Sequence, residues 1–162
     1  MNPLIALAEL GIAFSIKDPP AESGCSLEAL IVAGMPLVKT DLKAIKLLFT
    51  WLAANGDLLI EANLISALNN GGTKVDRAVV AGLLSKLPLS LKFNNLISGT
   101  EKVSDGGREI GLRLSRHIGQ GVCVPDPDLL RFGLLISEIN LLDVKKLRSR
   151  SYVVARAERV RA

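Results

Sequence analysis

The middle of the chain constrains the fold most, because three helix-sized apolar patterns follow one another there between residues that start and stop helices. In the first pattern, apolar residues recur at three- and four-residue steps, which places them on one face of a helix (Leu42, Ile45, Leu48, Phe49 and Leu52). Thr40 or Asp41 can cap its start, and Asn55-Gly56 supplies a left-handed stop. Trp51 makes the helix apolar nearly all round, which favours a central position in the domain over a contact with another chain.

Two further patterns follow after a short stretch, 57–60, that we expect to be extended. The first is a short helix that ends at a pair of glycines, with apolar residues facing inward (Leu64, Ile65 and Leu68). Thr73 with Asp76 three residues on is a variant of the capping box, so it predicts the start of another helix, which Pro88 ends. That helix has its own inward-facing set (Val75, Val79, Leu83 and Leu87).

This order of helix, extended stretch, short helix, glycine turn and helix is that of a tri-helical helix-turn-helix core. The stretch 89–99 alternates loosely around Asn94-Asn95, which indicates a stunted hairpin after the third helix. Over roughly residues 40–98 the chain therefore resembles winged-helix DNA-binding domains, in pattern rather than in family-specific residues. The alternative is a plain three-helix bundle.

The resemblance implies that the third helix reads bases with residues near its N-terminus. Lys74 and Arg77 stand there and could reach guanine or phosphate. Asp76 would be repelled by the phosphate backbone of DNA unless it acts as a helix cap. This is a small recognition set, and an ordinary solvated helix face is the competing interpretation.

The positive charge is concentrated at the C-terminal end of the chain. The net charge is +4, yet the segment from residue 145 onward carries seven basic residues and one acid, so the rest of the chain sums to −2. Tyr152, Val153 and Val154 favour an extended strand in this segment. As a nucleic-acid-binding arm it would offer phosphate contacts from several side chains (Lys145, Lys146, Arg148, Arg150 and Arg156). Alternatively it is a basic edge strand that guards against aggregation, or a solvated tail.

The remaining segments complete a mainly α fold with a few short strands. We expect a helical arm over 1–38, in which acids outnumber lysines, the helix-turn-helix-like unit over 39–99, and a C-terminal helical unit with a basic extended segment over 100–162. In the last unit, a polar loop (100–109) precedes a helix near 110–122. Asp126, Pro127 and Asp128 then predict the start of a helix that runs to about Ile139.

No catalytic or metal-binding pattern stands out in the sequence. His117 is the single histidine, and Cys25 and Cys123 have no Cys or His at ligand spacing, which is typical of small buried hydrophobes in a reducing cytoplasm. We therefore expect no catalytic residue, no metal, no cofactor and no small-molecule substrate. No apolar run is long enough to cross a bilayer, so no membrane role is expected.

Two functions fit these observations. The first is a small, non-catalytic nucleic-acid-binding or transcription-regulatory protein that acts on DNA or RNA. The second is an assembly or adaptor protein, since 49% of the chain is hydrophobic and some of that surplus can be buried by homo-oligomerisation or against a protein partner.

Overall fold

The computed structural model describes residues 1–12, 22–104, 113–114, 125–142 and 147–161, with backbone alone for 101–104 and 113–114. Over these residues the chain is mainly α-helical, as expected. The helices are α1 (Pro3–Leu10), α2 (Leu27–Val38), α3 (Leu42–Asn55), the 3₁₀ turn η1 (Gly56–Leu58), α4 (Glu61–Gly71), α5 (Lys74–Ser85), α6 (Asn94–Ser104), α7 (Pro127–Leu130) and α8 (Arg150–Arg161). Two strands of two residues each, β1 (Arg113–Leu114) and β2 (Leu135–Ile136), pair in parallel.

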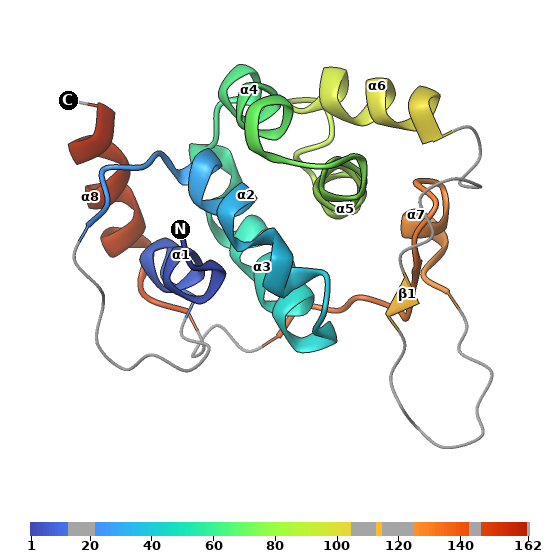
Figure 1. Ribbon diagram of the computed structural model, residues 1–162, viewed down its shortest axis with the longest axis horizontal. Helices are drawn as coiled ribbons and strands as arrows, with labels where there is room; N and C mark the ends of the chain where they lie inside the picture. The colour runs from blue at the N-terminus through green and yellow to red at the C-terminus, as the bar shows by residue number, and fades with distance from the viewer. Residues whose placement is uncertain (13–21, 105–112, 115–124, 143–146, 162) are drawn as a thin grey trace.

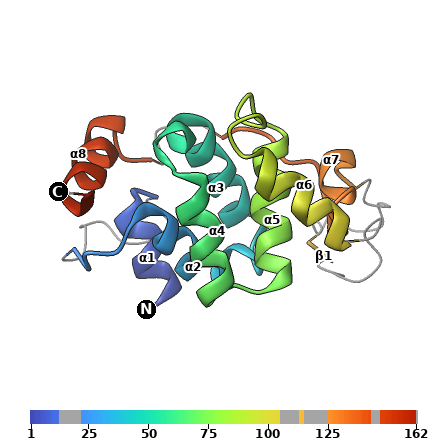
Figure 2. The ribbon, with the colours of Figure 1, turned by 90° about the horizontal axis from the view of Figure 1, so that it is seen from above.

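The helices form an elongated body in which α2 to α5 occupy the middle (Figures 1 and 2). Helices α1 and α8 lie side by side at one end of this body, while α7 and β1 lie at the opposite end. A single cluster of buried apolar residues extends from Ala6 to Ala157, so all three segments predicted from the sequence contribute to it.

Helix α3 is the central helix, which confirms the prediction for Trp51. It contacts α2, α5 and α8, and Trp51 is fully buried. The indole Nε1–H of Trp51 donates a hydrogen bond to the carbonyl of Leu10, 2.8 Å away. A buried Trp needs such a partner for its N–H group, and here the partner is the last residue of α1.

The helix starts predicted from sequence are confirmed in the middle of the chain. Asp41 caps α3 by accepting hydrogen bonds from the backbone N–H groups of Lys43 and Ala44. Thr73 and Asp76 form the reciprocal capping box of α5. These local signals are strong because they satisfy N–H groups that have no partner inside the helix.

The predicted hairpin over 89–99 is wrong. The chain turns after α5 and enters α6, which begins at Asn94. Phe93, Leu96 and Ile97 are buried there at three- and four-residue spacing, which is the period of a helix face. Helix α6 packs on α4 and α5, so its apolar face is buried against them. The alternating residues of a hairpin would not place these side chains on one face.

The C-terminal third also departs from the predicted pattern. Asp126 caps α7 and Pro127 stands at its first turn, as expected, but the helix ends at Leu130 instead of Ile139. Gly133, with φ of +80°, reverses the chain so that Leu135–Ile136 forms β2. Its partner β1 lies within the predicted 110–122 helix, whose other residues fall outside the described part of the chain, as does most of the 100–109 loop.

The predicted strand at Tyr152–Val154 is wrong as well, because this basic segment forms α8. Val153, Arg156 and Ala157 are its buried residues, and their spacing places them on one helical face. The β-propensity of Tyr and Val is therefore overridden by tertiary packing. No helix in the described ranges is long and apolar enough to cross a membrane.

Candidate functional site: the arginines of the C-terminal helix

Helix α8 binds the body of the protein through its arginines. Four of them lie against four carboxylates from separate segments: Arg150 against Asp57, Arg156 against Glu9, Arg159 against Glu22 and Arg161 against Glu28. We call these four carboxylates the acidic receptor. They come from η1, α1, the segment before α2, and α2.

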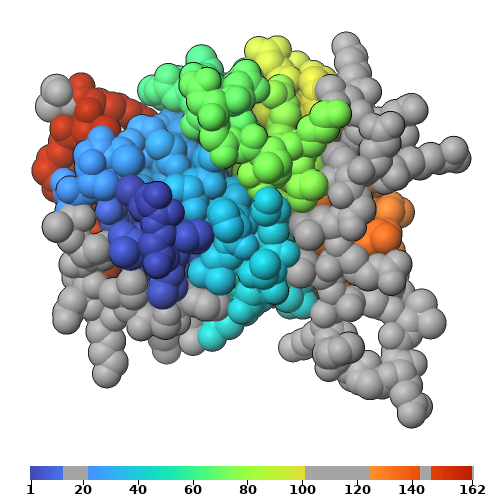
Figure 3. Space-filling model, viewed as in Figure 1, coloured from blue at the N-terminus to red at the C-terminus, as the bar shows by residue number. Residues whose placement is uncertain are grey.

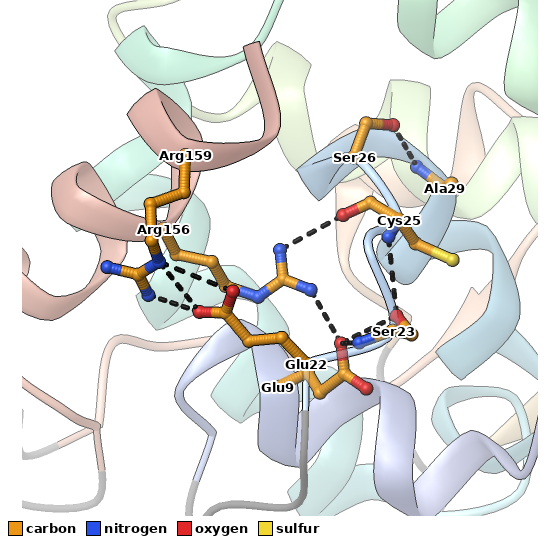
Figure 4. Close-up of polar contacts among 8 residues, drawn as sticks. All are labelled: Glu9, Glu22, Ser23, Cys25, Ser26, Ala29, Arg156 and Arg159. Carbon is orange, nitrogen blue, oxygen red and sulfur yellow. Dashed lines mark hydrogen bonds and ion pairs between the residues drawn. The ribbon is translucent and has the colours of Figure 1, made fainter. Parts of the chain in front are cut away.

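The centre of this contact is the buried pair of Glu9 and Arg156. The two side chains are 2% and 0% exposed, and Arg156 Nη2 donates to Glu9 Oε2 at 2.5 Å. The same carboxylate oxygen accepts a hydrogen bond from the Ser23 hydroxyl at 2.8 Å, and Arg156 Nη1 donates to the carbonyl of Cys25 at 3.0 Å. In Figure 4 the guanidinium of Arg156 lies between these two acceptors, and the Cys25 sulfur points away from it. The cluster thus joins α8 to both α1 and the start of α2.

The next pair is exposed and lies beside the buried one. Arg159 Nε donates to Glu22 Oε1 at 3.0 Å, and Arg159 Nη2 contacts the same oxygen (Figure 4). Hydrogen bonding from Arg159 holds the pKa of the Glu22 carboxyl below its ordinary value, and the same bond raises the pKa of Arg159.

Arg150 makes the pair at the other end of α8. Its two terminal nitrogens donate to the two oxygens of Asp57, at 2.9 and 2.6 Å, in the fork geometry that favours Arg over Lys. Arg150 also donates to the carbonyl of Ala54 at the C-terminal end of α3, where positive charge is favourable. The hydrogen bonds from Arg150 lower the pKa of the Asp57 carboxyl.

Arg161 closes the last turn of α8. It donates to the carbonyl of Leu58 at 2.6 Å and lies 3.7 Å from Glu28 Oε1. Glu28 is buried, and its Oε1 also accepts a hydrogen bond from the backbone N–H of Ile60, the residue before α4. Glu28 therefore links α2, α4 and α8 through one oxygen.

The charge of the segment 147–161, which contains α8, is balanced by these carboxylates. Residues 147–161 contain five arginines and one glutamate, a net charge of +4, and the acidic receptor carries −4. The fifth arginine, Arg148, stacks on Tyr152 at 5.4 Å from the ring centroid, and its backbone N–H donates to the carbonyl of Gly11 at 2.8 Å. Of the residues predicted for the arm, Arg150 and Arg156 are thus held by carboxylates, whereas Lys145 and Lys146 lie outside the described residues.

The two residues predicted on α5 are placed far from this cluster of arginines. Lys74 is exposed at the start of the helix. Arg77 instead joins three helices, because it donates to Asn69 at the end of α4 and to the Thr100 hydroxyl of α6. Eight of the twelve residues of α5 are buried, which leaves little surface to enter a DNA groove.

A second cluster of charges joins α5 to α7. Lys86 lies 2.8 Å from Asp126 and 3.2 Å from Asp128. Burial would raise the pKa of the Asp126 carboxyl, but hydrogen bonds from Lys86 and from two backbone N–H groups outweigh it, so that this pKa is lowered. The arrangement supports the sequence-based interpretation of Asp126 as a capping acid.

The body also carries a shallow, open apolar groove between the start of α1 and the end of α2. It has a volume of about 280 Å³ and is lined mainly by apolar side chains (Pro3, Leu4, Pro36 and Leu37, with Asn2 and Thr40 at its polar edges). Met1 and Ile5, next to it in the chain, are 58% and 36% exposed. Figure 3 shows α1 in dark blue at the surface of the molecule, with α2 beside it.

Comparison of the chain with protein-family models, with curated proteins and with solved structures gives no match. Among the described residues no group of His, Cys, Asp and Glu side chains is arranged to hold a metal ion, and His117 and Cys123 lie outside them.

Sequence reasoning missed the acidic receptor. The signal was present, because the first 38 residues are acidic and the last 18 are basic. Opposite charges at the two ends of a chain are expected to attract each other if the fold brings the ends together. Periodicity within each segment gives no indication that α1 and α8 become neighbours.

Proposed function

We propose that this protein is a non-catalytic assembly protein that associates with a second copy of itself through the α1–α2 groove. The observation that carries the proposal is the groove itself, with the exposed residues Met1 and Ile5 next to it in the chain. Exposed apolar side chains next to an apolar hollow favour a protein contact, since covering both removes apolar surface from water.

A second copy is the partner that this patch fits. In a two-fold symmetric dimer the same patch lies on both sides of the interface, so the patch must contain both a protrusion and a hollow. The exposed side chains of Met1 and Ile5, which neighbour groove residues in the chain, would supply the protrusion, and the groove would supply the hollow. The high apolar content of the chain agrees with this assignment. We further propose that the protein works in the cytoplasm, in keeping with its two isolated cysteines.

The proposal is tested by measuring mass in solution as a function of concentration, by sedimentation or light scattering. The 17.3 kDa chain should show a mass above that of the monomer as concentration rises. Ile5→Glu and Pro36→Glu should both shift the mass to that of the monomer, and both positions are exposed, so folding should survive. Leu91→Glu is the matched control, because Leu91 is 89% exposed but lies outside the groove, in the turn before α6. A wild-type chain that is monomeric at every concentration would overturn the proposal.

Nucleic-acid binding and the winged-helix-like core stay predictions. The order α3, α4, α5 agrees with the helix-turn-helix pattern, but α6 stands where the wing was expected and α5 is largely buried. Carboxylates hold Arg150 and Arg156, two of the five residues that the arm was expected to offer to phosphates, whereas Lys145 and Lys146 lie outside the described residues. The geometry therefore favours the assembly function.

A further inference from the structure

A partly enclosed cavity lies between the start of α2, the first turn of α4 and the last turns of α8. Its volume is about 190 Å³, far more than one water molecule occupies. Apolar walls and a few polar groups surround it, as in sites that bind small molecules. The lining consists of three apolar, two charged and two polar residues (Leu27, Ala157 and Val160, then Glu28 and Arg161, then Ser26 and Asn63).

The carboxylate of Glu28 is the buried charge of this cavity, and its side chain is 1% exposed. Its Oε1 accepts a hydrogen bond from the backbone N–H of Ile60 at 2.8 Å. Its Oε2 is also buried and has no hydrogen-bond donor among the described residues. A buried carboxylate oxygen without a donor is costly, so a ligand that donates a hydrogen bond to it gains binding energy. A positively charged donor, such as an ammonium group, gains most.

The same cavity offers donors to an anionic group. Arg161 contacts the carbonyl of Leu58 and the carboxylate of Glu28 through Nη2, so its other N–H groups can donate to a ligand. Leu27 and Glu28 form the first turn of α2, which Ser26 caps. Backbone N–H groups at this end of a helix have no acceptor inside it, and the helix dipole favours negative charge there.

We propose that this cavity binds a small aliphatic α-amino acid in its zwitterionic form. The ammonium group donates to Glu28 Oε2, and the carboxylate accepts from Arg161 and from the first turn of α2. The aliphatic side chain packs against the three apolar residues of the lining. One acid and one arginine sum to zero charge, so a ligand of zero net charge matches the cavity better than a simple cation or anion.

This inference goes beyond the proposed assembly function, because it names a ligand and a part of the molecule outside the α1–α2 groove. The sequence predicts no small-molecule substrate, since the lining residues lie on three helices far apart in the chain. A bound amino acid contacts all three helices and therefore stabilises the folded protein as its concentration rises.

Isothermal titration calorimetry with the full-length protein tests the ligand class without any variant. The probe is L-valine, compared with isobutylamine and isovalerate, which keep its branched carbon chain but have only the amine or only the carboxylate. Valine should bind, and each of the other two should bind at least ~10-fold more weakly, because each lacks one charge-assisted contact. Absence of valine binding at millimolar concentration, or equal affinities for valine and either analogue, would overturn the proposal.

Two variants then locate the site. Glu28→Gln keeps the shape of the side chain but removes its charge, so the Kd for valine should rise at least ~10-fold. Val160→Phe fills the cavity and should weaken binding to a similar degree. Val154→Phe is the matched control, because Val154 is also a half-buried valine of α8 but lies outside this cavity.

Melting temperatures without ligand show whether each variant is folded, and folded Val160→Phe protein that keeps the wild-type affinity for valine would also overturn the proposal. The outcome is separate from that of the proposed function. A chain that binds valine but is monomeric at every concentration would contradict the assembly proposal alone.

Discussion

Arg156 and Glu9 are 147 residues apart in the chain and form a buried ion pair in which Nη2 and Oε2 are 2.5 Å apart. The pair joins the last helix of the described chain to the first. It also directs into the molecule one of the charges that suggested a nucleic-acid-binding arm. Three further arginines of the same helix, Arg150, Arg159 and Arg161, also pair with carboxylates of the body, and their own side chains are exposed.

Arg156→Leu should destabilise the protein by about 3–5 kcal/mol, because it leaves the Glu9 carboxylate buried without a cation. Chemical denaturation followed by circular dichroism measures the free energy of unfolding. Arg159→Leu is the matched control on the same helix, and its effect should be far smaller because its pair with Glu22 is exposed. Equal losses in the free energy of unfolding from the two substitutions would show that the buried pair contributes no more to stability than the exposed one.

Stability should fall as the pH drops below about 5. The folded protein lowers the pKa of Glu22, Asp57 and Asp126, so the unfolded chain takes up protons at these sites first. Their contribution is therefore fully present above the ordinary carboxyl pKa of about 4 and is lost as the pH falls through the lower folded values. Thermal melts between pH 7 and pH 3 measure this slope. A variant with Glu22→Gln and Asp57→Asn should show a shallower slope, and an unchanged slope would exclude these two groups as its source.

Gly34→Ala should destabilise the contact between α1 and α2 by about 1–3 kcal/mol. A Cβ atom at Gly34 would lie 2.5 Å from Leu7 Cδ2 and 2.9 Å from Leu7 Cγ, so the Leu7 side chain or one of the two helices would have to shift. Gly71→Ala is a suitable comparison, since the nearest atom to its new Cβ, Val32 Cγ1, is 3.7 Å away. Denaturation midpoints of the two variants should differ clearly, and similar midpoints would contradict the close approach of α1 to α2.

Removing the exposed arginines of α8 should leave any affinity for duplex DNA unchanged. Arg150 and Arg159 are bound to carboxylates, so they have little free charge to offer to phosphates. Fluorescence anisotropy at several salt concentrations measures the slope of affinity against salt. If both arginines contacted phosphate, Arg150→Ala with Arg159→Ala would reduce this slope by about 1.8, that is 0.9 for each contact. Such a reduction would restore the nucleic-acid-binding interpretation of this segment.

Local signals in the sequence predicted the middle of the fold well. Asp41, Thr73 and Asp76 define helix starts through their own hydrogen bonds, and the apolar spacing around Trp51 defines a buried helix. These features depend on residues a few positions apart, so one sequence is enough to read them.

The site could not be predicted in the same way, because its two halves lie at opposite ends of the chain. Tyr152–Val154 favours a strand when considered alone, but in α8 Val153 and Ala157 pack on the body and Arg156 meets Glu9. Arg77 is a similar case. Its position at the start of a helix favours DNA contact, yet Asn69 and Thr100 bind its guanidinium. In both cases a tertiary partner decides the role of the side chain, and local propensity carries no information on that partner.

Hydrogen exchange of the backbone amides of residues 150–161 is the most direct test of the central claim, that the basic C-terminal segment is a helix bound to the body by its arginines. The reference is a synthetic peptide of residues 147–162, which is too short to be a stable helix in water. In the full-length protein the amides of Val153 to Arg161 should exchange at least ~100-fold more slowly than in the peptide, and Arg156→Leu should remove most of that protection. Exchange at the rate of the free peptide would contradict the account.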